Sequence, residues 1–185
     1  MCGERAGWID LLGYQGKVRM ELANTAPKIF PLTIPKLGAS ESELVSAESR
    51  LGEPLDRHLR ELLGFADGWP SIFLDVDLLG TADLGDGPAW ESAHSTLDDI
   101  YDDGLPPDLP PKNELFPFAR AQFDQTLFVT WSNGPITDGG HPVIWLHNEV
   151  VERYSNVRMW LTEVARLTKL RLETYQREGV PHGLE

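Results

Sequence analysis

Several features are scarce in this 185-residue sequence, and each scarcity excludes a class of protein. The single cysteine, Cys2, excludes an intramolecular disulfide and a zinc site built on two thiolates. No run approaches the ~18 apolar residues that cross a bilayer, so we expect no membrane span. The first residues lack the basic region and continuous apolar stretch of a secretory signal, so we expect a cytoplasmic protein.

Positive charge is also scarce, with 16 Lys and Arg against 29 Asp and Glu and a formal net charge of −13. Nucleic-acid binding that is independent of base sequence needs Lys and Arg to neutralise phosphates, so this balance argues against it. The same balance argues against docking on anionic lipid. A basic protein is the kind of partner that such a chain suits.

Apolar and aromatic residues are present in ordinary amounts for a folded protein. Hydrophobic residues make up 41% of the chain, and six Trp, seven Phe and four Tyr can form a packed core. A chain of this length buries roughly 70% of its unfolded surface, so it needs no disulfide or metal to fold. We expect one domain at residues 40–177, with an N-terminal extension at 1–39 and a tail at 178–185.

The two ends of the chain are expected to differ from the domain. A short helix is expected around Trp8, followed by extended chain over Gly13–Gly38, because this segment contains Pro27, Pro31 and Pro35. The extension can be a strap packed over the core or an interaction arm. The closing residues 183–185 resemble the remnant of a cloning site.

Two helices are predicted at the start of the domain. Ser40 and Glu43 form a capping-box pattern, and Gly52 is placed to end the first helix. Pro54 suits the first turn of the second helix. Its expected buried stripe consists of Leu55, His58, Leu59, Leu62 and Leu63.

The rest of the domain predicts a sheet and a closing helix. Ile72–Leu78 is expected to be one strand, and Gly80–Pro111 mostly loop with a short helix near Ser95–Tyr101. A strongly amphipathic helix beginning near Val157 closes the domain. This order predicts an α+β domain with an antiparallel-rich mixed sheet flanked by helices. The other four strands are expected at Leu115–Ala119, Thr126–Trp131, Pro142–His147 and Val150–Tyr154.

Motifs of catalysis and metal binding are missing from the sequence. It has no G-x-S-x-G elbow, no phosphate-binding Gly-rich loop and no H-E-x-x-H. Asp75 and Asp77 begin like a calcium loop, but Leu79 stands where an oxygen ligand is required. We therefore predict no catalytic residue, metal or cofactor, and no enzyme. A hydrolase or transferase that uses carboxylates is the remaining enzymatic alternative.

Acidic residues are concentrated in one block, from Asp75 to Glu114. This block contains eleven Asp and Glu and one cation, Lys112. It can be a solvated surface that keeps the protein in solution, or a docking face that steers a basic partner.

The sequence resembles the SUKH superfamily of Smi/Knr-type domains over about residues 40–170. The resemblance begins with the Glu-bearing first helix, the Leu51-Gly52 break and the Asp67-Gly68-Trp69 turn. It continues through Leu115–Ala119, which resembles the family's "ipfa" strand, to the closing helix. Residues 54 and 55 invert the usual Leu-Pro order, and Asp67 replaces the usual Asn.

The resemblance implies an α+β domain without catalytic residues. Its bacterial branch implies an immunity protein that binds and neutralises a polymorphic toxin, often a nuclease or deaminase. Its fungal branch implies the alternative, an intracellular scaffold or regulatory interaction protein. The motif residues are interpreted as fold residues: Ser40, Glu43, Glu48, Leu51, Gly52, Pro54, Gly68 and Trp69.

The acidic block and the resemblance together predict the binding surface. A nuclease must carry cations to hold phosphates, so an inhibitor that covers its active site gains from dense carboxylates. Two aromatic residues of the block can anchor the interface or cap the core. We expect a basic toxin domain as partner, with no nucleic acid or membrane, and favour a monomer. The candidate residues are Asp75, Asp77, Asp83, Asp86, Trp90, Glu91, Asp98, Asp99, Tyr101, Asp102 and Asp103.

Overall fold

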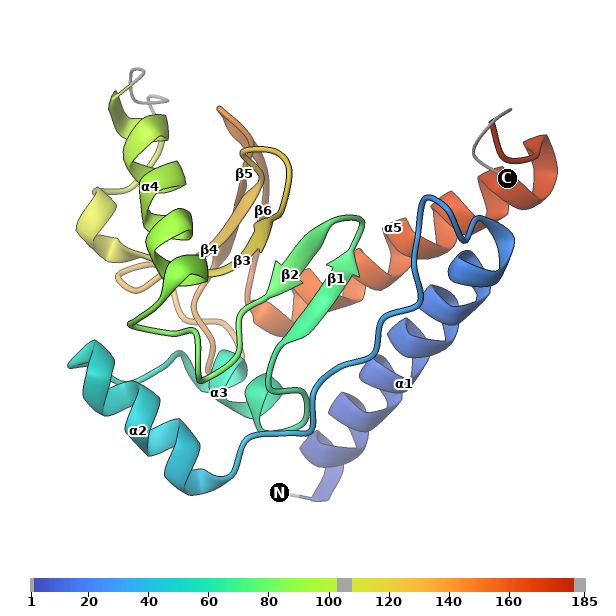
Figure 1. Ribbon diagram of the computed structural model, residues 1–185. Helices are drawn as coiled ribbons and strands as arrows, with labels where there is room; N and C mark the ends of the chain where they lie inside the picture. The colour runs from blue at the N-terminus through green and yellow to red at the C-terminus, as the bar shows by residue number, and fades with distance from the viewer. Residues whose placement is uncertain (1, 103–107, 182–185) are drawn as a thin grey trace.

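The computed structural model describes residues 2–102 and 108–181, without the side chains of residues 2–6. The candidate Asp103 and the chain end 182–185 lie outside the described residues. Within the described part the chain forms one α+β domain, as predicted, with helices around an open sheet (Figure 1).

The sheet is a meander in which each strand pairs antiparallel with the next one along the chain. Helix α4 (Pro88–Asp102) is inserted between the second and third strands. Every strand pairing among the described residues is antiparallel, so the sheet is not mixed. The strands are β1 (Trp69–Phe73), β2 (Val76–Leu78), β3 (Leu115–Ala121), β4 (Leu127–Trp131), β5 (Val143–Leu146) and β6 (Val150–Tyr154).

The single strand predicted over Ile72–Leu78 is wrong, because the chain reverses within it. Leu74 has a φ of 52°, and β1 pairs with β2 through Phe73 and Val76. The expected alternation survives in β2, where Val76 is buried, but Leu74 lies in the turn and is half-buried. The four later strands were predicted within one or two residues of their observed ends.

The predicted capping box of helix α2 (Glu41–Leu51) is confirmed. The backbone N–H of Ser40 donates to Glu43 Oε2 at 2.8 Å, and Gly52 ends the helix with a φ of 75°. The place of Pro54 was predicted wrongly, because helix α3 (Arg57–Leu63) begins after Asp56. The Asp56 carboxylate caps it by accepting from the backbone N–H groups of its first turn.

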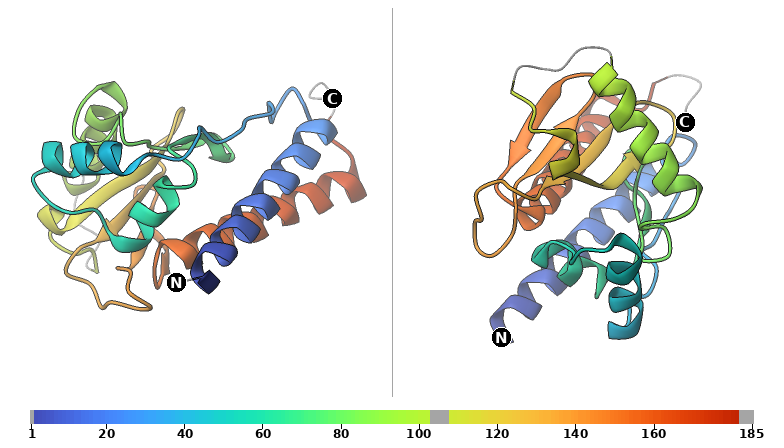
Figure 2. Two further views of the ribbon diagram at one scale, coloured as in Figure 1. Left: turned by 90° about the horizontal axis from the view of Figure 1, so that it is seen from below. Right: turned by 90° about the vertical axis from the view of Figure 1, so that its left-hand side faces the viewer.

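Helix α1 (Cys2–Thr25) corrects the prediction of extended chain after residue 12. It lies along helix α5 (Val157–Glu178), as Figures 1 and 2 show. The three prolines of the extension all follow the helix, so they set its end and do not disrupt it. The sequence of α1 does not show the apolar period of a helix, because polar Gln15 and Arg19 are buried while Met20 is exposed.

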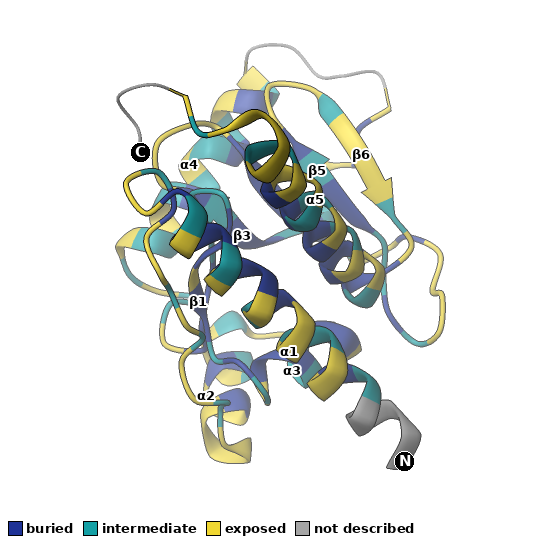
Figure 3. Cartoon of the chain, turned by 90° about the vertical axis from the view of Figure 1, so that its right-hand side faces the viewer, coloured by how far each residue is buried: buried dark blue, intermediate teal, exposed yellow. Residues whose placement is uncertain are grey.

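The core lies on both faces of the sheet. All residues from Leu127 to Thr130 are buried, and successive strand residues point to opposite faces, so both faces of β4 are covered. The right-hand view of Figure 2 and Figure 3, which are seen from opposite sides, show the sheet between α4 and α5. On the α5 side the Trp160 ring meets the Phe118 ring edge to face, with centroids 4.9 Å apart.

Candidate protein-binding surface

Helix α4 carries the largest group of candidate carboxylates. Ala93, Leu97 and Ile100 are buried, so the helical period turns the acids away from the sheet. The sequence predicted only a short helix here, near Ser95–Tyr101. The observed helix is longer because Pro88, which is favourable in a first turn, begins it and the other prolines of the block follow it.

Five carboxylates form the surface that we call the α4 acidic face. Four lie on the helix and one lies just before it. On a helix of 3.6 residues per turn, the positions of the four helical acids fall within about 100° of one another. The members are Asp86, Glu91, Asp98, Asp99 and Asp102; Asp98 is half-buried and the others are exposed.

Little positive charge balances this face. Lys112 is the one cation between Glu61 and Ala119, and its ammonium pairs with Asp98. None of the ion pairs found among the described residues involves Asp86, Glu91, Asp99 or Asp102. The face therefore carries an excess of negative charge, since only Asp98 of its five carboxylates is ion-paired among the described residues.

The candidates Asp75 and Asp77 lie in the β1–β2 hairpin, apart from α4 (Figure 1). Asp77 Oδ1 accepts hydrogen bonds from the Ser71 backbone N–H at 2.7 Å and from Gln122 Nε2 at 2.8 Å. Asp75 Oδ2 accepts from the Phe123 backbone N–H at 3.3 Å. These two carboxylates hold the hairpin against the β3–β4 turn, and the structure does not bring them to the α4 acidic face.

The two candidate binding residues in the loop before α4 have different environments. Asp83 is half-buried and accepts a hydrogen bond from the Gly80 backbone N–H at 3.0 Å, which closes a turn. Asp86 is exposed and accepts from the Gly87 backbone N–H at 2.8 Å. Arg50 lies against the same loop and donates to the Leu84 carbonyl at 3.0 Å. Only Asp86 therefore adds to the helix carboxylates.

The two aromatic candidates have different environments. The Tyr101 hydroxyl donates to the Pro110 carbonyl, and burial, aided by Glu114, raises the pKa of Tyr101 to about 12. Tyr101 thus tethers the end of α4 to the segment before β3. Trp90 is half-buried and packs against Phe116, with ring centroids 5.2 Å apart.

Trp90 also forms one wall of a hollow beside the helix, which we call the α4 pocket. Its volume is about 460 Å³, and it lies between α4, the end of α2 and the segment that leads into β3. Only Trp90 among its members was a predicted binding residue, because the lining comes from three separate segments. The lining includes Leu51, Glu53, Trp90, His94, Lys112 and Phe116.

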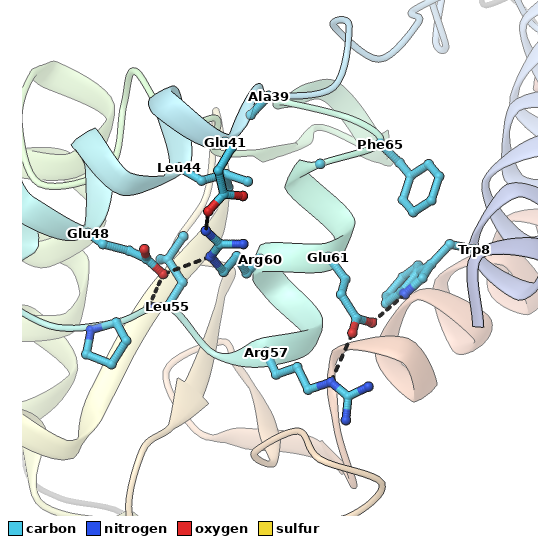
Figure 4. Close-up of a pocket in the computed structure, with 12 residues that line it drawn as sticks. Trp8, Ala39, Glu41, Leu44, Glu48, Leu55, Arg57, Arg60, Glu61 and Phe65 are labelled. Atoms are coloured by element: carbon cyan, nitrogen blue, oxygen red, sulfur yellow. Dashed lines mark hydrogen bonds and ion pairs between the residues drawn. The ribbon is translucent and has the colours of Figure 1, made fainter. Parts of the chain in front are cut away.

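A larger hollow of about 890 Å³, the α1–α3 groove, lies between the first three helices (Figure 4). Its charged residues are paired with one another. Arg60 bridges Glu41 and Glu48, with Nε 3.1 Å from Glu48 Oε1. Glu48, predicted as a fold residue, also accepts from the Leu55 backbone N–H at 3.2 Å.

Glu61 is the groove acid nearest to α1. Burial alone would raise its pKa, but hydrogen bonds from Trp8 Nε1 at 2.9 Å and Arg57 Nε at 3.0 Å lower the pKa below its ordinary value. A carboxylate held ionised in this way is a poor general base. Its contacts fasten α1 to α3.

The described residues provide no group of three or more His, Cys, Asp or Glu side chains that could hold a metal ion. In the same part of the chain, no helix has the length and apolar character to cross a membrane. Comparison with known proteins adds no family: no family model matches the chain, and no curated protein matches it either.

Proposed function

We propose that this chain is a non-enzymatic, cytoplasmic immunity protein of the SUKH type that binds and neutralises a basic toxin domain. The observation that carries the proposal is the α4 acidic face, where four of the five carboxylates have no ion-pair partner among the described residues. Such a field steers a cationic partner toward the surface and orients it on approach.

The position of two of these carboxylates supports a binding role. Asp99 and Asp102 lie in the last turn of α4, which contains no basic residue. The C-terminal end of a helix carries partial negative charge, so acids there lower stability by about 0.3–1 kcal/mol each. Charges that oppose folding are commonly retained where function needs them.

The first experiment identifies the partner. The protein is used to capture proteins from a lysate of its native cell, with washes at low and moderate salt. The expected result is one stoichiometric basic protein that is toxic when expressed alone and is silenced by this chain. Several substoichiometric partners without toxicity would contradict the proposal and favour the scaffold alternative.

A matched pair of variants then tests the surface. Glu91→Gln, Asp99→Asn and Asp102→Asn together remove three charges from the α4 acidic face. The control removes three charges elsewhere by Asp10→Asn, Glu173→Gln and Glu178→Gln, on α1 and the end of α5 remote from α4 (Figure 1). We expect the first variant to slow toxin association about tenfold and the control to change it less than about twofold. Equal slowing by both would show that net charge, not this face, steers the partner.

A further inference from the structure

The α4 pocket lies next to the α4 acidic face and differs from it in having aromatic walls. The Trp90 ring lies 4.4 Å from the His94 ring and 5.2 Å from the Phe116 ring, between centroids. Trp90 and His94 are four residues apart on α4, so they lie on one face of the helix, and their rings pack together at an interplanar angle of 58°.

His94 adds a neutral polar group to this wall. Its Nε2 is buried and has no hydrogen-bond partner among the described residues. Burial lowers the pKa of His94, with Asp98 opposing and Lys112 adding to the effect, so the imidazole is uncharged at neutral pH. A neutral imidazole does not repel a cation.

The pocket also has one carboxylate in its lining. Glu53, from the connection between α2 and α3, is exposed and lines the pocket. Asp98 lies one turn beyond His94 on α4, outside the pocket lining, and pairs with the lining residue Lys112. Glu53 is thus the carboxylate of the pocket without an ion-pair partner among the described residues.

We propose that the α4 pocket receives an arginine side chain of the basic partner; this inference rests on the proposed function and assigns its anchor. A guanidinium is planar and weakly hydrated, so it stacks on aromatic rings and donates to a carboxylate at the same time. The Glu53 carboxylate in the lining disfavours an anion there. The pocket's volume of about 460 Å³ is within the usual range for a site that encloses a small ligand.

Lysine fits this site less well than arginine. An ammonium is compact and strongly hydrated and has no flat face to place against Trp90. Lys112 is already present at the rim and balances Asp98, which leaves the aromatic wall and Glu53 for the incoming group.

The test is an NMR titration of the full chain with the peptide acetyl-Gly-Gly-Arg-Gly-Gly-amide. The control peptide has citrulline, which is neutral and nearly isosteric, in place of arginine. We expect shifts centred on the Trp90 indole N–H and the His94 and Phe116 amides, and binding of the citrulline peptide at least about fivefold weaker. Equal binding of the two peptides, shifts elsewhere, or no shifts at tens of millimolar arginine peptide would overturn the proposal.

Two variants check the residues. Trp90→Leu keeps an apolar wall but removes the indole, and Glu53→Gln keeps the shape but removes the charge. We expect each to weaken the arginine peptide about threefold to tenfold, while Glu173→Gln on α5 leaves it unchanged. Circular dichroism confirms that each variant is folded, and unchanged binding by both folded variants would refute the pocket.

Failure of the pocket proposal can be distinguished from failure of the proposed immunity function. A toxin that associates in a salt-dependent manner but binds Trp90→Leu as tightly as the wild type contradicts the pocket and supports the acidic face. If the pocket binds the arginine peptide selectively but the chain captures several scaffold-type partners and no toxin, the pocket proposal is supported and the immunity proposal is contradicted.

Discussion

The α1–α3 groove and the region around α4, which comprises the α4 pocket and the α4 acidic face, both combine carboxylates with a tryptophan, but they differ in how those groups are used. In the groove, Glu41, Glu48 and Glu61 are each paired with an arginine, and Trp8 donates to Glu61. On the α4 acidic face only Asp98 of the five carboxylates forms an ion pair among the described residues, with Lys112. Balanced charges hold the helices together, whereas unbalanced ones remain available to a partner.

The two tryptophans provide the largest contrast. Trp8 is 1% exposed and joins α1 to α3, whereas Trp90 is half-buried at the rim of a pocket. Trp8→Ala should lower the free energy of unfolding by about 3–5 kcal/mol, and Trp90→Ala by only about 1 kcal/mol. Urea denaturation measures both values. Equal losses would mean that Trp90 is as much a core residue as Trp8.

The ion pairs give the next contrast. The Arg60 side chain is 31% exposed and Glu48 is 20% exposed, whereas Lys112 and Asp98 are 44% and 49% exposed. Arg60→Gln leaves the partly buried Glu48 and the exposed Glu41 without their cation and should cost about 1–2 kcal/mol, mostly through Glu48. Lys112→Gln breaks a solvated pair and should cost less than about 0.5 kcal/mol. Thermal unfolding of both variants checks this order. A larger loss of stability for Lys112→Gln than for Arg60→Gln would contradict it.

The α4 acidic face should be mildly destabilising. Asp99→Asn combined with Asp102→Asn removes negative charge from the C-terminal turn of α4 and should raise stability by about 0.5–1 kcal/mol. Glu91→Gln, in the first turn of the same helix, should instead lower stability by about 0.3 kcal/mol, because an acid there is favourable. Chemical denaturation at low salt separates the two signs. Destabilisation by the Asp99 and Asp102 pair would show that these acids make stabilising contacts.

His94 gives the smallest effect, which depends on pH. Because burial lowers its pKa in the folded state, the unfolded chain binds the proton first as pH falls. Its contribution to stability is therefore present above about pH 6.5 and is lost progressively below that value, toward the lower pKa of the folded state. Urea denaturation from pH 7.5 to 5 should show a smaller loss for His94→Gln than for the wild type. Parallel pH profiles would contradict the burial of the imidazole.

Local patterns predicted much of the fold. The capping box at Ser40, the left-handed Gly52 and the four strands from Leu115 onward were found because each depends on neighbouring residues. The first turns of helix α1, around Trp8, were predicted, but the rest was missed because its buried face includes Gln15 and Arg19, whose place is set by α5 and the following segment.

The candidate site was only partly predictable. The count of acids identified α4 and its surroundings, but not that Asp77 holds a hairpin while Asp99 faces solvent. The α4 pocket requires Glu53, Trp90 and Phe116 to meet from three segments, and no spacing in the sequence specifies that meeting.

The most direct test of the account is the association rate constant of the captured toxin domain, measured by stopped flow from about 50 to 500 mM salt. Screening shortens electrostatic reach to a few ångströms at the upper end. We predict that the rate falls steeply for the wild type, by about tenfold or more, and much less for the variant with Glu91→Gln, Asp99→Asn and Asp102→Asn. A wild-type rate that is indifferent to salt, or identical slopes for the two proteins, would contradict the role of the α4 acidic face.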